Sequence, residues 1–130
     1  NDRRIRVSKR NKLKSCIFSI FNENTMNEKN SLINYFEKIN LLSYQSDSVT
    51  RSFGSSALSF AWLASGKIDC LFVSILNKNQ IACGELLIKE AGGYLTNLKY
   101  INAYDARSNF LIGANPILHK EVLKKINQKY

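Results

Sequence analysis

The sequence is poor in cysteine, histidine and proline, with three, one and one of these residues among 130. The cysteines, Cys16, Cys70 and Cys83, lie far apart in apolar surroundings, without a Cys-x-x-Cys pair or a Cys/His pair at metal-ligand spacing. Such a set argues against a disulfide framework or a zinc site and predicts reduced, buried thiols. Cys83 also has no histidine near it in the sequence, so it is not a candidate nucleophile.

Long hydrophobic runs are absent as well. No apolar stretch approaches the ~18 residues that a membrane-spanning helix requires. The charged N-terminus is not followed by the apolar segment of a signal peptide. We therefore expect a cytoplasmic protein without a membrane partner. Because the sequence does not begin with methionine, we also expect it to be one part of a longer protein.

The formal charge of +9 is concentrated near the N-terminus. Residues 1–14 contain seven of the nineteen basic residues and a single acid, Asp2. A basic arm of this kind can bind RNA, a nucleoprotein or another polyanion. The other interpretation is a solvated edge strand and turn, which the lack of interleaved aromatic residues favours.

The pattern of apolar residues predicts strands that alternate with helices within one domain, residues 1–130. The strands are expected over residues 5–8, 13–21, 46–53, 67–76, 94–96 and 109–114. The helices are expected over residues 26–39, 55–66 and 79–91, and from Pro116 onward. The helix over 55–66 is apolar nearly all round and the run over 67–76 is densely apolar, so both are expected to be buried. Gly66 is expected in the left-handed conformation that commonly ends a helix. The alternation indicates the α/β class, with a mixed sheet between helices on both faces: a three-layer αβα sandwich.

Four sequence segments occur in an order that closely resembles the C-terminal half of the inositol monophosphatase family, including its bacterial, SuhB-like members. The matching segments are Gly54-Ser55-Ser56-Ala57-Leu58, Ala64-Ser65-Gly66-Lys67-Ile68-Asp69, Ile81-Ala82-Cys83-Gly84 and Glu90-Ala91-Gly92-Gly93. They correspond to the family's G-[ST]-A-A-L, A-x-G-x-[IVL]-D, W-D-x-A-A-G and E-A-G-G patterns. "NDRRIRVS" near the start and "IGANP" near the end are similar to further family patterns, so the resemblance covers essentially the whole chain.

The resemblance implies a Mg²⁺-dependent phosphomonoesterase acting on inositol or sugar phosphates, and a homodimer. It also implies a two-part molecule. The family's N-terminal domain carries a glutamate that binds metal and a D-P-[LI]-D-G-T loop, and this chain contains neither. The C-terminal domain, which this chain resembles, contributes contacts to the small phosphorylated substrate and one further metal ligand, the aspartate of W-D.

Gln80 takes the place of that aspartate when Ile81-Ala82-Cys83-Gly84 is aligned with the family pattern. Magnesium prefers charged oxygen ligands, and a glutamine carbonyl lacks the charge that offsets desolvation. By the same register Val73 stands where the family often has an acid that reads the substrate hydroxyls. We therefore predict that this chain alone does not hydrolyse phosphomonoesters. The other interpretation of Gln80 is an ordinary residue in the first turn of a helix.

The remaining candidates are three residues before a buried helix and two isolated ionisable residues. Gly54, Ser55 and Ser56 are predicted to contact the substrate, because backbone N–H groups at a helix N-terminus bind anions. A serine here would also serve as the helix N-cap. Asp69 is interpreted as a structural turn residue and His119 as a surface residue, so no catalytic residue is predicted. A degenerate module that keeps the fold for dimerisation, or for binding RNA through the basic arm, stays open as an alternative function.

Overall fold

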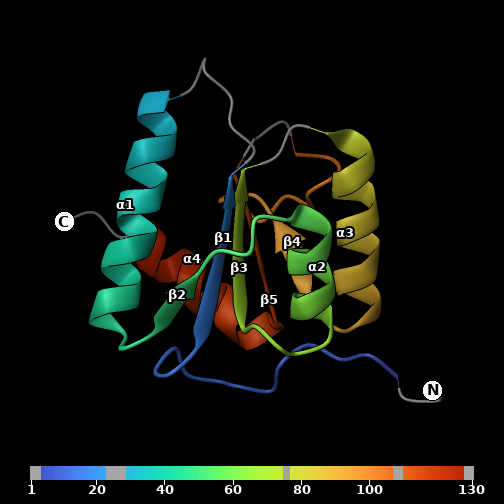
Figure 1. The fold of residues 1–130 in the computed structure, drawn as a ribbon, viewed down its shortest axis with the longest axis horizontal. Helices are drawn as coiled ribbons and strands as arrows, with labels where there is room; N and C mark the ends of the chain where they lie inside the picture. The colour runs from blue at the N-terminus through green and yellow to red at the C-terminus, as the bar shows by residue number, and fades with distance from the viewer. Residues whose placement is uncertain (1–3, 23–28, 75–76, 107–109, 128–130) are drawn as a thin grey trace.

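The computed structural model describes residues 4–22, 29–74, 77–106 and 110–127, with the side chains of the second range described from residue 34. Five strands and four helices follow one another along the chain (Figure 1). They are β1 (Ile17–Asn22), α1 (Lys29–Gln45), β2 (Val49–Arg51), α2 (Ser56–Ala64), β3 (Cys70–Ser74), α3 (Lys78–Glu90), β4 (Tyr94–Thr96), β5 (Phe110–Ala114) and α4 (Pro116–Ile126). Within these ranges, no helix combines the length and the apolar character needed to cross a bilayer.

The strands form one mixed sheet in the order β2-β1-β3-β5-β4. β1 is parallel to both β2 and β3, whereas β5 runs antiparallel to β3 and to β4. Since α2 follows β2 and α3 follows β3, both helices begin at the edge of the sheet where the parallel strands end (Figure 1). Ligand sites of open α/β sheets form at this edge, which we call the carboxyl edge.

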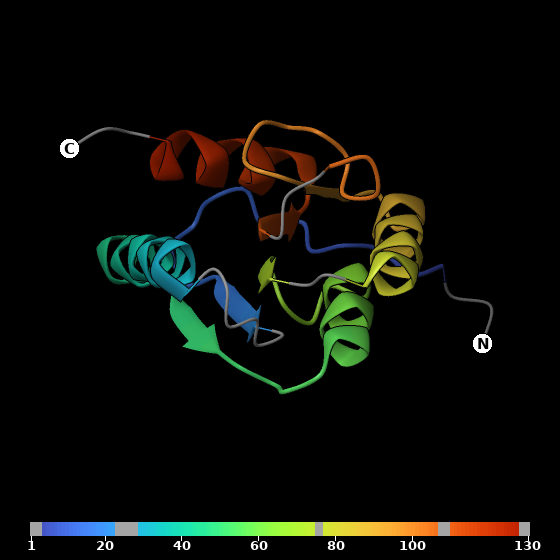
Figure 2. The same cartoon turned by 90° about the horizontal axis from the view of Figure 1, so that it is seen from above.

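Helices cover both faces of the sheet, as the sequence pattern predicts. α1 and α4 lie on one face, and α2 and α3 lie on the other (Figure 2). β3 shows the division most clearly, because Cys70 and Phe72 pack into the first core while Leu71 and Val73 pack into the second. All five residues of β3 are buried, which confirms the predicted central strand and the three-layer αβα architecture.

α2 and α3 pack closely because Gly84 has no side chain. A Cβ atom at Gly84 would lie 2.7 Å from two carbons of the Phe60 ring. Phe60 is itself buried, so its ring has little room to move. Gly66, just beyond the end of α2, has a φ of +78°, which confirms the expected left-handed residue after this helix.

Two predicted elements differ from the structure. The segment 5–8 was expected to be a strand, and this is wrong: it is extended but joins no sheet, because its partner is the end of α3, where Val7 donates to the Ala91 carbonyl. The helix expected over 26–39 begins at Lys29 and continues to Gln45. It is longer because Leu42 continues the buried face of Tyr35 and Ile39, while Met26 lies outside the described residues.

The prediction of buried thiols is confirmed for two cysteines and wrong for the third. Cys16 and Cys70 are buried, whereas Cys83 is exposed. The reason is its position on α3, whose buried residues are Ile81, Gly84 and Ile88. Cys83 therefore lies on the outward side of the helix.

Candidate functional site at the carboxyl edge

A cavity of about 310 Å³ lies between α2 and α3 at the carboxyl edge. Its lining residues come from the first two turns of each helix: Ser56, Ala57 and Phe60 from α2, and Asn79, Gln80 and Cys83 from α3. The structure thus brings together Ser56 and Gln80, two residues that the sequence analysis singled out separately. We call this space the interhelix cavity.

The turn before α2 positions backbone N–H groups at the edge of the sheet. Gly54 has a φ of +69°, and a Cβ placed there would meet no atom within 4 Å. The Ser55 hydroxyl is the N-cap and accepts a hydrogen bond from Leu58 N at 3.2 Å, which confirms the expected cap. The amides of Ser56 and Ala57 have no partner among the described residues. They are therefore the groups at this helix N-terminus that can receive an anion.

The first turn of α3 differs, because its own cap already uses its amides. The Asn77 side chain accepts hydrogen bonds from Asn79 N at 2.9 Å and from Gln80 N at 3.2 Å. The Gln80 side chain is exposed, and the first turn has no acidic residue. The polar side chains that α3 offers the cavity, Asn79, Gln80 and Cys83, therefore carry no carboxylate.

These residues do not form a Mg²⁺ site by themselves. The polar side chains that line the interhelix cavity are a hydroxyl, two amides and a thiol, whereas Mg²⁺ is usually bound through carboxylates. In the described part of the chain, no three His, Cys, Asp or Glu residues come together in a metal-binding group. Val73 is fully buried in the core on this face of the sheet.

Asp69 lies at the opposite edge of the sheet, directly before β3. Its Oδ2 accepts a hydrogen bond from Ile17 N at 2.7 Å, and its Oδ1 lies 3.5 Å from the Arg10 Nε. The carboxylate is thus buried and joins the start of β1 to the turn before β3, as expected of a structural residue. Burial, and secondarily the charge of Asp69, raises the pKa of the neighbouring Cys16 thiol to about 11, so this thiol is unreactive.

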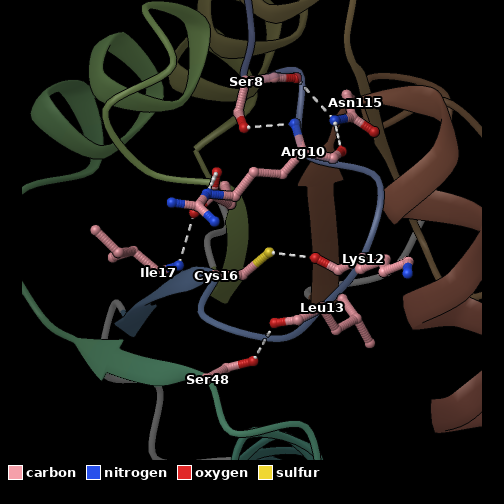
Figure 3. A network of polar contacts seen from close by, with 9 residues as sticks. Ser8, Arg10, Lys12, Leu13, Cys16, Ile17, Ser48 and Asn115 are labelled. Atoms are coloured by element: carbon pink, nitrogen blue, oxygen red, sulfur yellow. Dashed lines mark hydrogen bonds and ion pairs between the residues drawn. The ribbon is translucent and has the colours of Figure 1, made fainter.

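Residues 4–14 form a strap along this second edge, and we call it the basic strap. Its backbone is fixed at several points: Val7 N donates to Ala91 O at 3.0 Å, and Ser48 Oγ donates to Leu13 O at 2.7 Å (Figure 3). Its six basic side chains are exposed: Arg4, Arg6, Lys9, Arg10, Lys12 and Lys14. The predicted arm is therefore a segment of fixed backbone that carries exposed basic side chains at the edge opposite the interhelix cavity.

Asn115 holds the basic strap in place, a role that the sequence analysis did not assign. Its Nδ2 donates to the carbonyls of Ser8 and Arg10, each at 2.7 Å (Figure 3). Its Oδ1 accepts from Leu118 N at 2.8 Å. The sequence indicates one of the two roles of Asn115, because an asparagine before a proline is a typical helix N-cap. The two bonds to the strap span more than a hundred residues and have no local pattern.

His119 was expected on the surface, and this is wrong. Its side chain is buried between the rings of Tyr94 and Tyr100 and lies 2.7 Å from the Thr96 hydroxyl. Burial lowers the pKa of His119 to about 4. The reason for its burial is helical periodicity, since it lies on the face of α4 that also carries Val122 and Ile126.

Comparisons with known proteins agree on the family. The family model described as "Inositol monophosphatase family" matches residues 1–130. The chain is 30% identical over 128 residues to fructose-1,6-bisphosphatase/inositol-1-monophosphatase of Thermotoga maritima, covering 98% of this chain and 46% of that protein. It is 29% identical over 131 residues to the putative Nus factor SuhB of Neisseria meningitidis serogroup B, covering 98% and 47%.

A solved structure gives the same result for the fold. The extragenic suppressor protein SuhB of Bartonella henselae superposes with a TM-score of 0.81 at 25% identity, over 100% of this chain and 48% of that one. The chain thus spans about half the length of the relatives it matches. The order of its segments, its mixed sheet and these comparisons together show that the chain belongs to the inositol monophosphatase family and corresponds to the C-terminal half of its members.

Proposed function

We propose that this chain, residues 1–130, is the C-terminal domain of a protein with the two-domain arrangement of the family's phosphomonoesterases. We also propose that its carboxyl edge contacts a small phosphorylated substrate such as an inositol or sugar phosphate. The observation that carries the proposal is the interhelix cavity. Ser56, Ala57 and Gln80 are among its lining residues, and the backbone amides of Ser56 and Ala57 have no partner among the described residues. A phosphate at a helix N-terminus gains hydrogen bonds and favourable electrostatics.

The chemistry proposed for this chain is binding and orientation of the substrate. The amides at the start of α2 would hold a phosphate oxygen, and Gly54 leaves open space beside them. Mg²⁺, in proteins of this family, would supply Lewis-acid activation of the phosphate and of water. The carboxylates for such a site are missing from the described residues. We therefore propose that the isolated chain binds phosphate weakly and does not hydrolyse it.

The test uses the chain and its Gln80→Asp variant, with Mg²⁺ binding followed by calorimetry in the presence of inositol monophosphate. We expect binding heat from the variant and none above the dilution blank from the natural chain, because the carboxylate restores charge at the cavity. Phosphate release by the natural chain should equal that of a buffer blank.

Gln45→Asp provides a matched control, since it makes the same charge change at an exposed position at the end of α1. It should leave Mg²⁺ binding unchanged. Mg²⁺-dependent turnover by the natural chain would contradict the proposal, as would detectable Mg²⁺ binding of equal strength by Gln80→Asp and Gln45→Asp. If neither variant nor natural chain binds, the metal site requires residues from outside this chain.

A second candidate function is binding of RNA or a nucleoprotein through the basic strap. The observation that favours it is the set of six exposed basic side chains on this strap. Hydrogen bonds from Asn115 and Val7 fix the backbone beneath them, so binding a polyanion would not require this segment of backbone to become ordered. One similar protein, in N. meningitidis, is named a putative Nus factor rather than a phosphatase.

RNA binding should fall steeply with salt and should depend on the strap rather than on total charge. Arg4→Gln combined with Lys9→Gln is expected to reduce the slope of log K against log salt by roughly 1.5, since each phosphate contact contributes about 0.7 to 0.9. Lys38→Gln combined with Lys99→Gln removes the same charge from exposed positions elsewhere and should change the slope much less. Equal slopes for the two double variants would contradict the proposal that RNA binds through the basic strap.

A further inference from the structure

A second cavity lies on the other side of α3, against the edge strand β4. Its volume is about 500 Å³, within the range of small-molecule sites, roughly 300 to 1,000 Å³. α3 contributes Glu85 and Lys89 to its lining, β4 contributes Tyr94, and the loop after β4 contributes Tyr104 and Asp105. It shares no lining residue with the interhelix cavity.

The loop that closes this cavity is held in place by several hydrogen bonds. The Asn97 side chain accepts from Lys99 N at 2.8 Å and from Ile101 N at 2.9 Å, and Ala103 N donates to Leu95 O at 3.0 Å. On the far side, the Lys78 ammonium donates to the carbonyl of Tyr104 and lies 4.9 Å from the centre of its ring. The wall opposite α3 is therefore preformed, which lowers the entropic cost of binding a ligand.

Glu85 gives this cavity its chemical preference. Its Oε1 is buried and has no hydrogen-bond partner among the described residues. A carboxylate oxygen without water or a donor is costly to bury. Partial burial of the Glu85 side chain also reduces the screening of its charge. Because Oε1 has no accessible surface, a cation in the cavity would meet this carboxylate through its other oxygen, Oε2. Asp105, on the closing loop, adds a second acidic side chain.

Lys89 is the basic side chain among the lining residues of this cavity, and it can compete for this position. It follows Glu85 by four residues on α3, a spacing at which side chains meet on a helix. Nevertheless, the described residues show no ion pair between Lys89 and either acid. With two carboxylates and one ammonium group, the lining keeps an excess of negative charge, although the chain as a whole carries +9.

We propose that this cavity binds a small organic cation that carries a guanidinium or primary ammonium group. The carboxylates of Glu85 and Asp105 would accept its hydrogen bonds, and the rings of Tyr94 and Tyr104 would provide aromatic walls of the kind that favour cations. This cavity would thus prefer a cation, whereas we propose that the neighbouring carboxyl edge prefers phosphate, an anion.

The test is calorimetric titration of the full chain with agmatine at low ionic strength. Two substitutions should act in opposite directions. Glu85→Gln is expected to weaken binding at least tenfold, because it removes the partly buried charge. Lys89→Met is expected to strengthen binding several-fold, because it removes the competing ammonium and preserves the length of the side chain.

Two controls make the outcome specific. Glu37→Gln, at an exposed position of α1, removes the same charge elsewhere and should leave affinity unchanged. 4-Guanidinobutanoate, which adds a carboxylate to the guanidinium, should bind more weakly than agmatine. Thermal melting confirms that each variant is folded. The proposal is overturned if neither the natural chain nor Lys89→Met binds agmatine, or if Glu85→Gln and Glu37→Gln bind it equally.

Discussion

Gly84→Val is expected to lower the free energy of unfolding by at least about 3 kcal/mol, at the upper end of the cost of overpacking a core. The first added carbon alone would lie 2.7 Å from the Phe60 ring. Phe60 is 3% exposed, so its ring can yield only toward the interhelix cavity that it lines or by a separation of α2 and α3. Since domains are stable by only about 5 to 15 kcal/mol, urea unfolding should show a much lower midpoint.

Cys83→Val separates packing from helix propensity, because it introduces the same side chain at the next, exposed position of α3. It should change stability by less than about 0.5 kcal/mol, as surface substitutions usually do. Shortening the opposing ring with Phe60→Leu should make Gly84→Ala less costly than it is alone, which a double-mutant cycle measures. If Cys83→Val is as destabilising as Gly84→Val, close helix packing is not the cause.

Acid should destabilise the domain through His119. The folded-state pKa of His119 is lowered from 6.5 to about 4 by burial, so between these values the unfolded chain binds more protons than the folded one. Stability is therefore fully present above pH 6.5 and falls as the pH drops toward 4. At 1.36 kcal/mol for each pKa unit, the loss reaches about 3 kcal/mol. Urea unfolding at a series of pH values measures it.

The hydrogen bonds at His119 explain why the neutral ring is preferred. The Thr96 hydroxyl donates to the Asn97 carbonyl at 2.8 Å, so toward His119 it acts as an acceptor, and Nε2 carries the proton. Nδ1 is then an acceptor, buried and without a partner among the described residues. Protonating it would create a buried donor and a buried charge together.

His119→Gln is the informative control, because a glutamine amide keeps a donor near Thr96 and does not titrate. Its stability should depend on pH less than that of the natural chain between 6.5 and 4. The chain has no other histidine, so a difference in this range reports on His119 directly. Identical pH profiles for the two proteins would contradict the expectation.

The sequence predicted the buried elements well because their signals are local. The dense apolar run around β3 and the all-round apolar character of α2 describe a strand covered on both faces and an inner helix. The cap at Ser55 and the turn at Gly66 likewise depend on their immediate neighbours. Each of these features was expected at or within a few residues of its place in the structure.

The features that the sequence missed depend on contacts between distant segments. Alternation over residues 5–8 is typical of a strand, but a strand also needs a partner strand, and this segment lies against the end of α3. The interhelix cavity lies between two helices that pack closely because Gly84 faces Phe60, a pairing with no local pattern. His119 has Lys120 and Glu121 beside it in the sequence. These charged neighbours indicated a surface position, although His119 belongs to the buried face of its helix.

The two hydrogen bonds from Asn115 to the basic strap also set an order of events during synthesis. A ribosome makes residues 8–10 more than a hundred residues before Asn115, the amide that holds their carbonyls. The sheet around β1, β2 and β3 can therefore assemble while this attachment is still missing. Until α4 emerges, the strap lacks its final attachment, and its cations are free to meet any polyanion nearby. Closure of the domain at this edge thus follows the synthesis of Asn115 and α4.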